Sequence, residues 1–119
     1  MYVNPTGAEG FGITALEAMA CGIPLVSPVH TGMTEFLNGS NCVQVPCELG
    51  KENFEYATNS GPIYKIRKSD LANAMILAYN NYNQLVDNAV SHSGYIRNRF
   101  SWVNVLQGFL QWLEILNQN

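Results

Sequence analysis

The stretch EGFGITALEAMACG, residues 9–22, constrains the fold of this chain more than any other feature. Its glycines indicate a loop, and residues 13–20 are mostly the strong helix formers Ala, Leu, Met and Glu. Gly22 follows at the position where a left-handed residue often ends a helix. Residues 24–26 are Pro-Leu-Val and predict a short buried strand that begins with proline. The order of loop, helix and strand is typical of a parallel α/β unit.

The rest of the first half continues this alternation with shorter elements. Residues 2–3 predict the end of a strand before the loop, and residues 33–37 predict a second short helix. Residues 42–45 predict the next strand, because they follow a strong turn signal, Asn-Gly-Ser-Asn. Residues 46–62 are polar and aperiodic, which predicts a long loop or insertion, and residues 63–66 predict a final short strand.

The second half predicts three helices. Ser69 is a suitable N-cap for the first, whose apolar residues recur at helical spacing as far as Tyr82. The second is expected at about residues 84–97, and Ser101 is expected to cap the third. The third helix is apolar on two sides, with Val103, Val105, Leu106, Phe109, Leu110, Trp112, Leu113, Ile115 and Leu116. One small core does not need so much apolar surface, so this helix is expected to pack against something that the chain lacks.

Length and charge exclude several classes of protein. At 119 residues the chain fits one domain, and its 47% hydrophobic and 13% charged residues exclude a disordered chain. The net charge is −3, and the six Lys and Arg are dispersed except at Lys65, Arg67 and Lys68. Nucleic acid requires a basic surface that such a sequence does not provide, so no nucleic-acid partner is expected.

The cysteines and histidines do not form a disulfide or metal pattern. Cys21, Cys42 and Cys47 are odd in number and contain no C-x-x-C pair, and His30 and His92 are far apart. No zinc site or disulfide framework is therefore expected, which favours a reducing compartment. The sequence also has no signal-peptide pattern and no run of about 18 apolar residues. We expect a cytoplasmic chain with no metal and no membrane span.

Glu17 is the single charged residue of the predicted first helix. Its neighbours three and four positions away are Ile13, Thr14, Ala20 and Cys21, of which only Thr14 carries a hydroxyl. A helix this apolar is expected to be buried on nearly all sides, with Cys21 in the core. A buried carboxylate is costly unless something binds it, so Glu17 is a candidate ligand-binding residue. The alternative is that Glu17 points outward and has no function.

Residues 7–12, Gly-Ala-Glu-Gly-Phe-Gly, predict an anion-binding loop. Glycines let the backbone approach a ligand closely, and their N–H groups join those of the helix that begins near Ile13. The helix dipole adds positive potential there, which suits a phosphate or diphosphate. Glu9 would repel phosphate but is suited to accept hydrogen bonds from hydroxyl groups. A nucleotide sugar fits these requirements; the alternative is a glycine-rich turn with an exposed Glu9.

With these residues, the chain resembles the donor-binding region of retaining glycosyltransferases of family 4, which have the GT-B fold. Members carry a glutamate, seven residues and a second glutamate, and here Glu9 and Glu17 enclose Gly-Phe-Gly-Ile-Thr-Ala-Leu. Residues 18–26 continue the pattern into the following strand. The similarity is dense over residues 4–45 and weak over residues 46–98.

Two later motifs match the same family. Gly32 and Glu35 resemble its glycine and glutamate on the next loop and helix start. Residues 100–102, Phe-Ser-Trp, resemble its aromatic-Ser-Trp entry to the C-terminal helix. The run from the first glutamate through the following strand is far more specific than a pair of glutamates alone.

The resemblance implies a role for each residue of the loop and first helix. Glu17 would accept hydrogen bonds from the ribose of the nucleotide, and Glu9 would be the catalytic residue, accepting hydrogen bonds from the transferred sugar. The residues whose backbone would contact the sugar and diphosphate are Gly10, Phe11, Gly12, Ile13 and Thr14. Family members transfer a hexose from a nucleoside diphosphate sugar to an acceptor hydroxyl with retention. They generally need no metal, so no cofactor and no metal ligand are expected.

The resemblance covers only part of a GT-B enzyme. Such enzymes have two Rossmann-like domains with the active site between them, and residues 1–119 resemble the later part of the second. The N-terminal domain, which binds the acceptor hydroxyl of a glycan, lipid or protein, has no counterpart in this sequence. The upstream Arg and Lys that contact the diphosphate have none either. We therefore expect a fragment or truncated product with a partial Rossmann-like domain, a short parallel sheet and a helix-rich C-terminal half, inactive in transfer alone.

Two other functions stay open. Gly10-x-Gly12-x-x-Ala15 satisfies the fingerprint of dinucleotide-binding oxidoreductases, and the acidic Glu35 follows about 20 positions later. That fingerprint normally follows a full strand, and its acid ends the second strand, where this chain has Ser-Pro at residues 27–28. The other alternative is a catalytically inactive module that binds nucleotide sugar or uses the apolar last helix for interaction.

Overall fold

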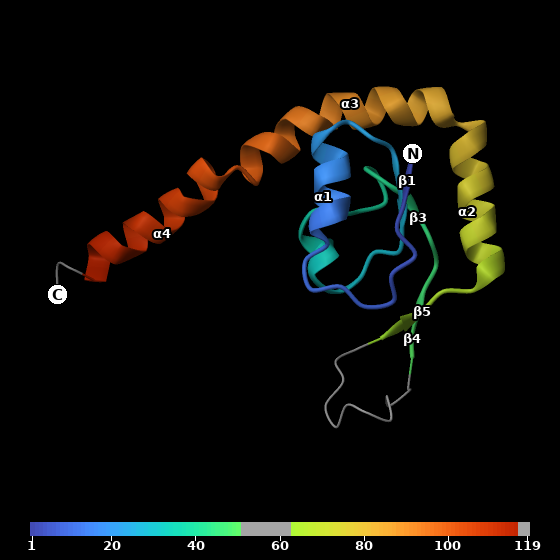
Figure 1. Ribbon diagram of the computed structural model, residues 1–119, viewed down its shortest axis with the longest axis horizontal. Coiled ribbons are helices and arrows are strands. Elements are labelled where there is room, and N and C mark those ends of the chain that lie inside the picture. The colour runs from blue at the N-terminus through green and yellow to red at the C-terminus, as the bar shows by residue number, and fades with distance from the viewer. Residues whose placement is uncertain (51–62, 117–119) are drawn as a thin grey trace.

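A three-stranded parallel sheet lies at the centre of the first half of the chain (Figure 1). The computed structural model describes residues 1–50 and 63–116. Its strands are β1 (Tyr2–Val3), β2 (Leu25–Ser27) and β3 (Val43–Gln44), in the order β1-β2-β3. Because all three run in parallel, their carboxyl ends lie at the same edge of the sheet.

The strand register places Tyr2 opposite Leu25 and Val26 opposite Val43. Two backbone hydrogen bonds extend the pairing beyond the strands, from the N–H of Asn4 to the carbonyl of Val26 (2.9 Å) and from the N–H of Tyr2 to Pro24 (2.8 Å). The predicted α/β class with a short parallel sheet is confirmed.

One helix covers each face of the sheet (Figure 1), α1 (Ile13–Ala20) on one side and α2 (Lys68–Asn80) on the other. Leu25 and Val26 are adjacent in β2 and point to opposite faces, as pleating requires. Leu25 belongs to the cluster under α1, with Ala15, Met19, Met33, Phe36, Leu37, Cys42 and Ile96. Val26 belongs to the cluster under α2, with Val43, Val45, Ala74 and Ala78. The core therefore has two halves that share one strand.

The bounds and the end of α1 agree with the sequence prediction. Gly22 has φ +71°, in the left-handed region, and its N–H donates to the carbonyl of Met19 (3.0 Å). From α3 (Tyr82–Arg99), the guanidinium of Arg97 donates to the carbonyl of Ala20 (2.6 Å). A cation at the carboxyl end of a helix stabilises both the free carbonyl and the helix dipole.

The prediction that α1 is buried on nearly all sides is wrong. Only one face, formed by Ala15, Ala18 and Met19, is buried. Ile13 is 63% exposed, and Glu17 and Cys21 are also exposed. The reason is that the sheet and α3 contact the same side of the helix, and no described residue covers the other side. Cys21 is therefore a surface residue and not a core residue.

Two other short elements differ from their predictions. Residues 31–35 form a 3-10 helix, η1 (Thr31–Glu35), where a helix at 33–37 was expected. The loop predicted over 46–62 contains a strand, β4 (Glu48–Leu49), which pairs antiparallel with β5 (Tyr64–Lys65). Two-residue strands carry no readable periodicity, and the rest of that predicted loop, residues 51–62, lies outside the described residues.

The start of α2 also differs from the prediction. The helix begins at Lys68 with Arg67 as N-cap, and no side chain caps it, so Ser69 is not the cap. The Arg67 Nε instead donates to the Asp70 carboxylate (2.8 Å), and this ion pair raises the pKa of Arg67. The carboxylate of Asp70 still lies in the first turn, where it interacts favourably with the helix dipole.

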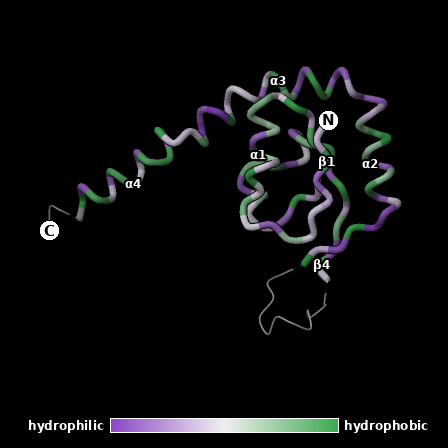
Figure 2. The backbone as a smooth tube through the Cα atoms, in the orientation of Figure 1, coloured by the Kyte–Doolittle hydropathy of each residue, from purple (hydrophilic) through white to green (hydrophobic). Residues whose placement is uncertain are grey.

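The last helix, α4 (Trp102–Leu116), projects away from the sheet (Figure 1), and along its length hydrophobic residues alternate with hydrophilic ones (Figure 2). The predicted cap is confirmed, because the N–H of Asn104 donates to the Ser101 hydroxyl (3.3 Å). Large apolar side chains stay open to solvent, with Trp102 at 79% and Phe109 at 53% exposure. Among the helices of the described residues, none is long and apolar enough to cross a membrane.

Gly94 provides a direct test of the packing of α3. It lies inside this helix, and no atom lies within 4 Å of the position that a Cβ would take. The substitution Gly94→Ala should therefore stabilise the chain by about 0.5–1 kcal/mol, because alanine loses less backbone entropy in a helix. Thermal unfolding followed by circular dichroism would measure this gain.

Gly22→Ala is the matched control for Gly94→Ala. At φ +71°, and with a Cβ position only 3.2 Å from a methyl group of Val90, alanine should lower the melting temperature. If Gly94→Ala also lowered it, the described position of α3 would be contradicted.

Candidate functional site

The glycine-rich loop lies at the carboxyl edge of the sheet, between β1 and α1, against the loop that follows β2. Gly12 precedes α1 with φ +86°, and a Cβ there would lie 2.7 Å from Cγ of Met33. A Cβ on Gly32 would overlap the carbonyl oxygen of Gly10. Gly12 therefore lets the first loop pack against the side chain of Met33. Gly32 lets the backbones of the two loops contact each other. Gly32 was expected on the loop after the second strand, and the structure brings it against the first loop.

The backbone N–H groups of residues 10–14, of which Gly12 is buried, form no hydrogen bond within the described structure. No side chain caps α1. Gly12 contributes its carbonyl to the helix by accepting from the N–H of Leu16 (3.0 Å). Ile13 and Thr14 are exposed, so this end of the helix is open to a ligand. Free amides and the positive end of a helix dipole favour an anion.

The carbonyl oxygens just before Glu9 are all engaged in hydrogen bonds. Thr6 accepts from the imidazole of His30 (2.9 Å), Gly7 accepts from the N–H of Tyr64 (2.6 Å), and Ala8 accepts from the hydroxyl of Thr6 (2.7 Å). The loop thus binds other segments through the carbonyl groups of Thr6 and Gly7, whereas the amide groups of residues 10–14 have no partner among the described residues. On its open side the loop therefore presents backbone N–H donors.

The two predicted carboxylates lie on either side of these amides. Glu9 is half-buried, and its Cγ lies 3.4 Å from the position that a Cβ on Gly12 would take. Glu17 is exposed on the same strip of α1 as Ile13 and Thr14. Helical Cα–Cβ bonds tilt toward the N-terminus, so the side chain of Glu17 leaves the helix toward the free amides. Neither carboxylate forms an ion pair or hydrogen bond with a described residue.

Phe11 and Thr14 fix the geometry of the loop and the first turn. The Phe11 ring packs against the rings of Phe36 (5.4 Å between centroids) and Phe100 (6.0 Å). The hydroxyl of Tyr2, in β1, donates to the Thr14 hydroxyl (3.0 Å). Phe100 begins the aromatic-Ser-Trp motif, so the structure places that motif, some 90 residues along the chain, beside the glycine-rich loop.

Two residues that hold the loop were not predicted to belong to the site. His30 directly follows the second strand, where a lone histidine is more often structural, and it is 2% exposed. Tyr64 stacks on it with 4.4 Å between ring centroids and 1° between planes. No local pattern identifies this pair, because His30 lies in the loop between β2 and η1, Tyr64 lies in β5, and the two meet only after folding.

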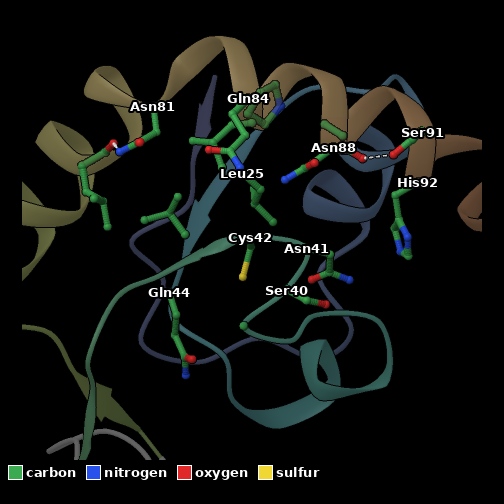
Figure 3. Close-up of a pocket in the computed structure, with 16 residues that line it drawn as sticks. Leu25, Ser40, Asn41, Cys42, Gln44, Asn81, Gln84, Asn88, Ser91 and His92 are labelled. Atoms are coloured by element: carbon green, nitrogen blue, oxygen red, sulfur yellow. Dashed lines mark hydrogen bonds between the residues drawn. The ribbon is translucent and has the colours of Figure 1, made fainter.

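A cavity of about 670 Å³, lined by both polar and apolar side chains, lies at the opposite, amino edge of the sheet. Figure 3 shows Gln84 and Asn88 of α3 on one side of it and Ser40 and Asn41 of the loop before β3 on the other. The described residues that line it include His92 but no Asp, Glu, Lys or Arg, so no permanent charge faces a diphosphate there. Cys42 also lines it, and burial raises the pKa of this thiol to about 11, which keeps it protonated and unreactive at neutral pH.

Metal and dinucleotide chemistry find little support in the part of the chain that the structure describes. No three His, Cys, Asp or Glu side chains within it are placed to hold a metal ion. Glu35, the acid of the dinucleotide fingerprint, is exposed at the end of η1 and not at the end of the second strand.

Comparisons with known proteins agree on one class of relative. A sequence model of the family described as Family 4 Glycosyltransferase in conflict systems matches residues 1–109. Sucrose synthase isoform 2 of Daucus carota is 32% identical over 59 residues, which are 49% of this chain and 7% of that protein. The O-antigen chain mannosyltransferase B of Escherichia coli is 38% identical over 48 residues, 40% of this chain and 13% of that protein.

A further relative covers a shorter segment. Sucrose synthase 4 of Oryza sativa subsp. japonica is 44% identical over 36 residues, 30% of this chain and 4% of that protein. The chain thus matches between 4% and 13% of the length of these relatives. No solved structure matches the chain.

Proposed function

Because the chain belongs to the family 4 glycosyltransferases in conflict systems, we propose that it supplies the donor site for a nucleoside diphosphate sugar. The observation that carries this proposal is the row of free amides at residues 10–14, with Glu9 before it and Glu17 after it. The amides and the helix dipole suit the diphosphate, and the carboxylates suit the hydroxyl groups on either side of it.

Each residue then has a separate role. Glu17 accepts hydrogen bonds from the ribose, and its exposure leaves it free to do so. Glu9 is the proposed catalytic residue and accepts hydrogen bonds from the transferred sugar. Phe11 holds the loop through its two ring contacts while its backbone faces the donor. Ile13 and Thr14 contribute backbone N–H groups, and a hydrogen bond to Tyr2 fixes the hydroxyl of Thr14.

The proposed reaction is transfer of a hexose to an acceptor hydroxyl of a glycan, lipid or protein, with retention and without a metal ion. Residues 4–14 and 28–35 contain no Lys or Arg, so the two loops neutralise a diphosphate through amides and the helix dipole alone. We therefore propose that this chain is the donor half of a GT-B active site. In this proposal, transfer requires a second domain that supplies the basic residues and the acceptor site.

A catalytically inactive binding module is the second candidate. The same lack of Lys and Arg in the loops favours it, because donor binding needs less charge stabilisation than the transition state of transfer. The exposed apolar surface of α4 also suits an interaction module. Donor binding without transfer, in the presence of a full acceptor-binding domain, would select this candidate.

The substitution Glu17→Gln tests the donor site with little risk to the fold. The carboxylate of Glu17 is exposed and has no partner within the described structure, so its loss should not change stability. Donor affinity should fall by about 1–3 kcal/mol, or roughly 5- to 150-fold in Kd, because charge-assisted hydrogen bonds to the ribose are lost. Isothermal titration calorimetry with UDP-glucose and GDP-mannose would measure the change.

Asp87→Asn is the matched control, since it removes an exposed carboxylate on α3. It should leave the donor Kd unchanged. An unchanged Kd in Glu17→Gln would remove the ribose role. Thermal protection by NAD, but by neither nucleotide sugar, would contradict the proposed function and favour the oxidoreductase alternative.

A further inference from the structure

The loop before Glu9 is held by a buried histidine whose two ring nitrogens both have partners. The Nε2 of His30 lies 2.9 Å from the carbonyl oxygen of Thr6, and Nδ1 lies 3.1 Å from the hydroxyl of Thr31. A carbonyl can only accept, so Nε2 must carry a proton. In the neutral ring, Nδ1 then accepts from the Thr31 hydroxyl. The contacts therefore define the tautomer and the orientation of the ring.

Thr31 is itself held in an unusual conformation. Its φ of +47° lies in the left-handed region, which non-glycine residues seldom adopt. Two contacts keep it there, one between its hydroxyl and His30 and one from the hydroxyl of Thr34 to its carbonyl (2.8 Å). Through its hydroxyl, the strained Thr31 fixes the position of Nδ1 of His30. Strained residues that are maintained by their surroundings are typical of functional sites.

Tyr64 completes the arrangement from β5. Its ring stacks face to face on the imidazole of His30, with 4.4 Å between centroids. Its backbone N–H donates to the carbonyl of Gly7 (2.6 Å), and a Cβ on Gly7 would lie 2.5 Å from the Tyr64 carbonyl oxygen. Tyr64 thus positions both the ring of His30 and the backbone of Gly7 in the loop.

We propose that His30 and Tyr64 are positioning residues for the donor site, an inference that rests on the proposed function. The pair holds the carbonyl oxygens of Thr6 and Gly7 away from the donor, where their partial negative charge would oppose a diphosphate. It thereby orients Glu9 and turns the following amides outward. Glu17 stands on α1 and does not depend on this pair.

The test uses four variants of the whole chain and the donors UDP-glucose and GDP-mannose. His30→Ala removes the N–H group that donates a hydrogen bond to the carbonyl of Thr6, and the Kd for the nucleotide sugar should rise about tenfold. His30→Gln retains an N–H at a similar position in a side chain of similar length, so Kd should return to within about threefold of wild type. Tyr64→Leu should weaken binding, and Tyr64→Phe, which keeps the stacked ring, should not. Circular dichroism would confirm that each variant is folded.

A double-mutant cycle separates positioning from general destabilisation. If His30 acts through the loop that carries Glu9, then His30→Ala should add less than about threefold to Kd in a Glu9→Gln background. In a Glu17→Gln background it should again add about tenfold. Equal additions in both backgrounds would overturn the inference while leaving the donor site intact.

A measurement without ligand tests the positioning role directly. In wild type, the ¹⁵N order parameters of residues 7–10 should be near 0.85 and should fall below about 0.6 in His30→Ala. Unchanged order parameters would overturn the inference even if donor affinity fell. Absence of wild-type binding to either nucleotide sugar, with the order parameters changed as expected, would instead overturn the proposed function.

Discussion

Replacing Gly32 by alanine should destabilise the chain by about 3 kcal/mol and lower its melting temperature by roughly 10 °C. A Cβ on Gly32 would overlap the carbonyl oxygen of Gly10 and would lie 2.9 Å from its carbon and 3.0 Å from Cα of Phe11. These atoms belong to the backbone and cannot turn aside as a flexible side chain can. The two loops must therefore separate, which also displaces the free amides. Thermal unfolding and donor titration would measure both effects.

Gly10→Ala is a closely matched control for this substitution. The two glycines meet at the same contact, but nothing lies within 4 Å of a Cβ built on Gly10. Its stability should stay within about 0.5 kcal/mol of wild type. If Gly32→Ala unfolded at the same temperature as Gly10→Ala, the described contact between the loops could not be correct.

Met33→Ala should have an equal or larger effect, about 2–5 kcal/mol. Met33 is fully buried below the glycine-rich loop, beside Gly12. Its sulfur accepts from the amide of Asn4 (3.5 Å) and from the hydroxyl of Ser27 (3.9 Å), both of which are buried. Alanine would leave a cavity at the junction of the two loops and would remove the acceptor of the Asn4 amide, whereas the Ser27 hydroxyl would keep the carbonyl of Pro28 as acceptor (2.9 Å). Urea unfolding would measure the change.

Met33→Leu separates these two contributions. Leucine nearly conserves the volume of methionine, so the packing loss should stay below about 1.5 kcal/mol. Any excess over that value reports the loss of sulfur as acceptor for the Asn4 amide. Equal destabilisation by leucine and alanine would show that packing at Met33 is not what joins the loops.

Local sequence patterns predicted the elements that local physics determines. The bounds of α1 follow from a run of strong helix formers and a left-handed Gly22, and both features are confirmed. The start of α2 was missed because an ion pair between Arg67 and Asp70 takes the place of the expected cap. β4 was missed because two residues cannot show an alternation.

The candidate site divides in the same way. Its continuous part, from Glu9 to Glu17, could be selected from the sequence because glycines, helix start and carboxylates are adjacent. The exposure of Glu17 could not be predicted, since it depends on which side of α1 the sheet and α3 contact. The contributions of His30 and Tyr64 depend on contacts between distant segments and required the structure.

The parallel register of the sheet has a consequence for the order in which the chain folds. Opposing residues such as Tyr2 and Leu25, or Val26 and Val43, are separated by about twenty positions, so every strand pair must close a loop before it gains a contact. Helices α2 and α3 depend on near neighbours and can form sooner. The glycine-rich loop follows the end of β1, so we expect it to become ordered only when the sheet has closed. The last region to assemble is therefore the one on which activity would depend.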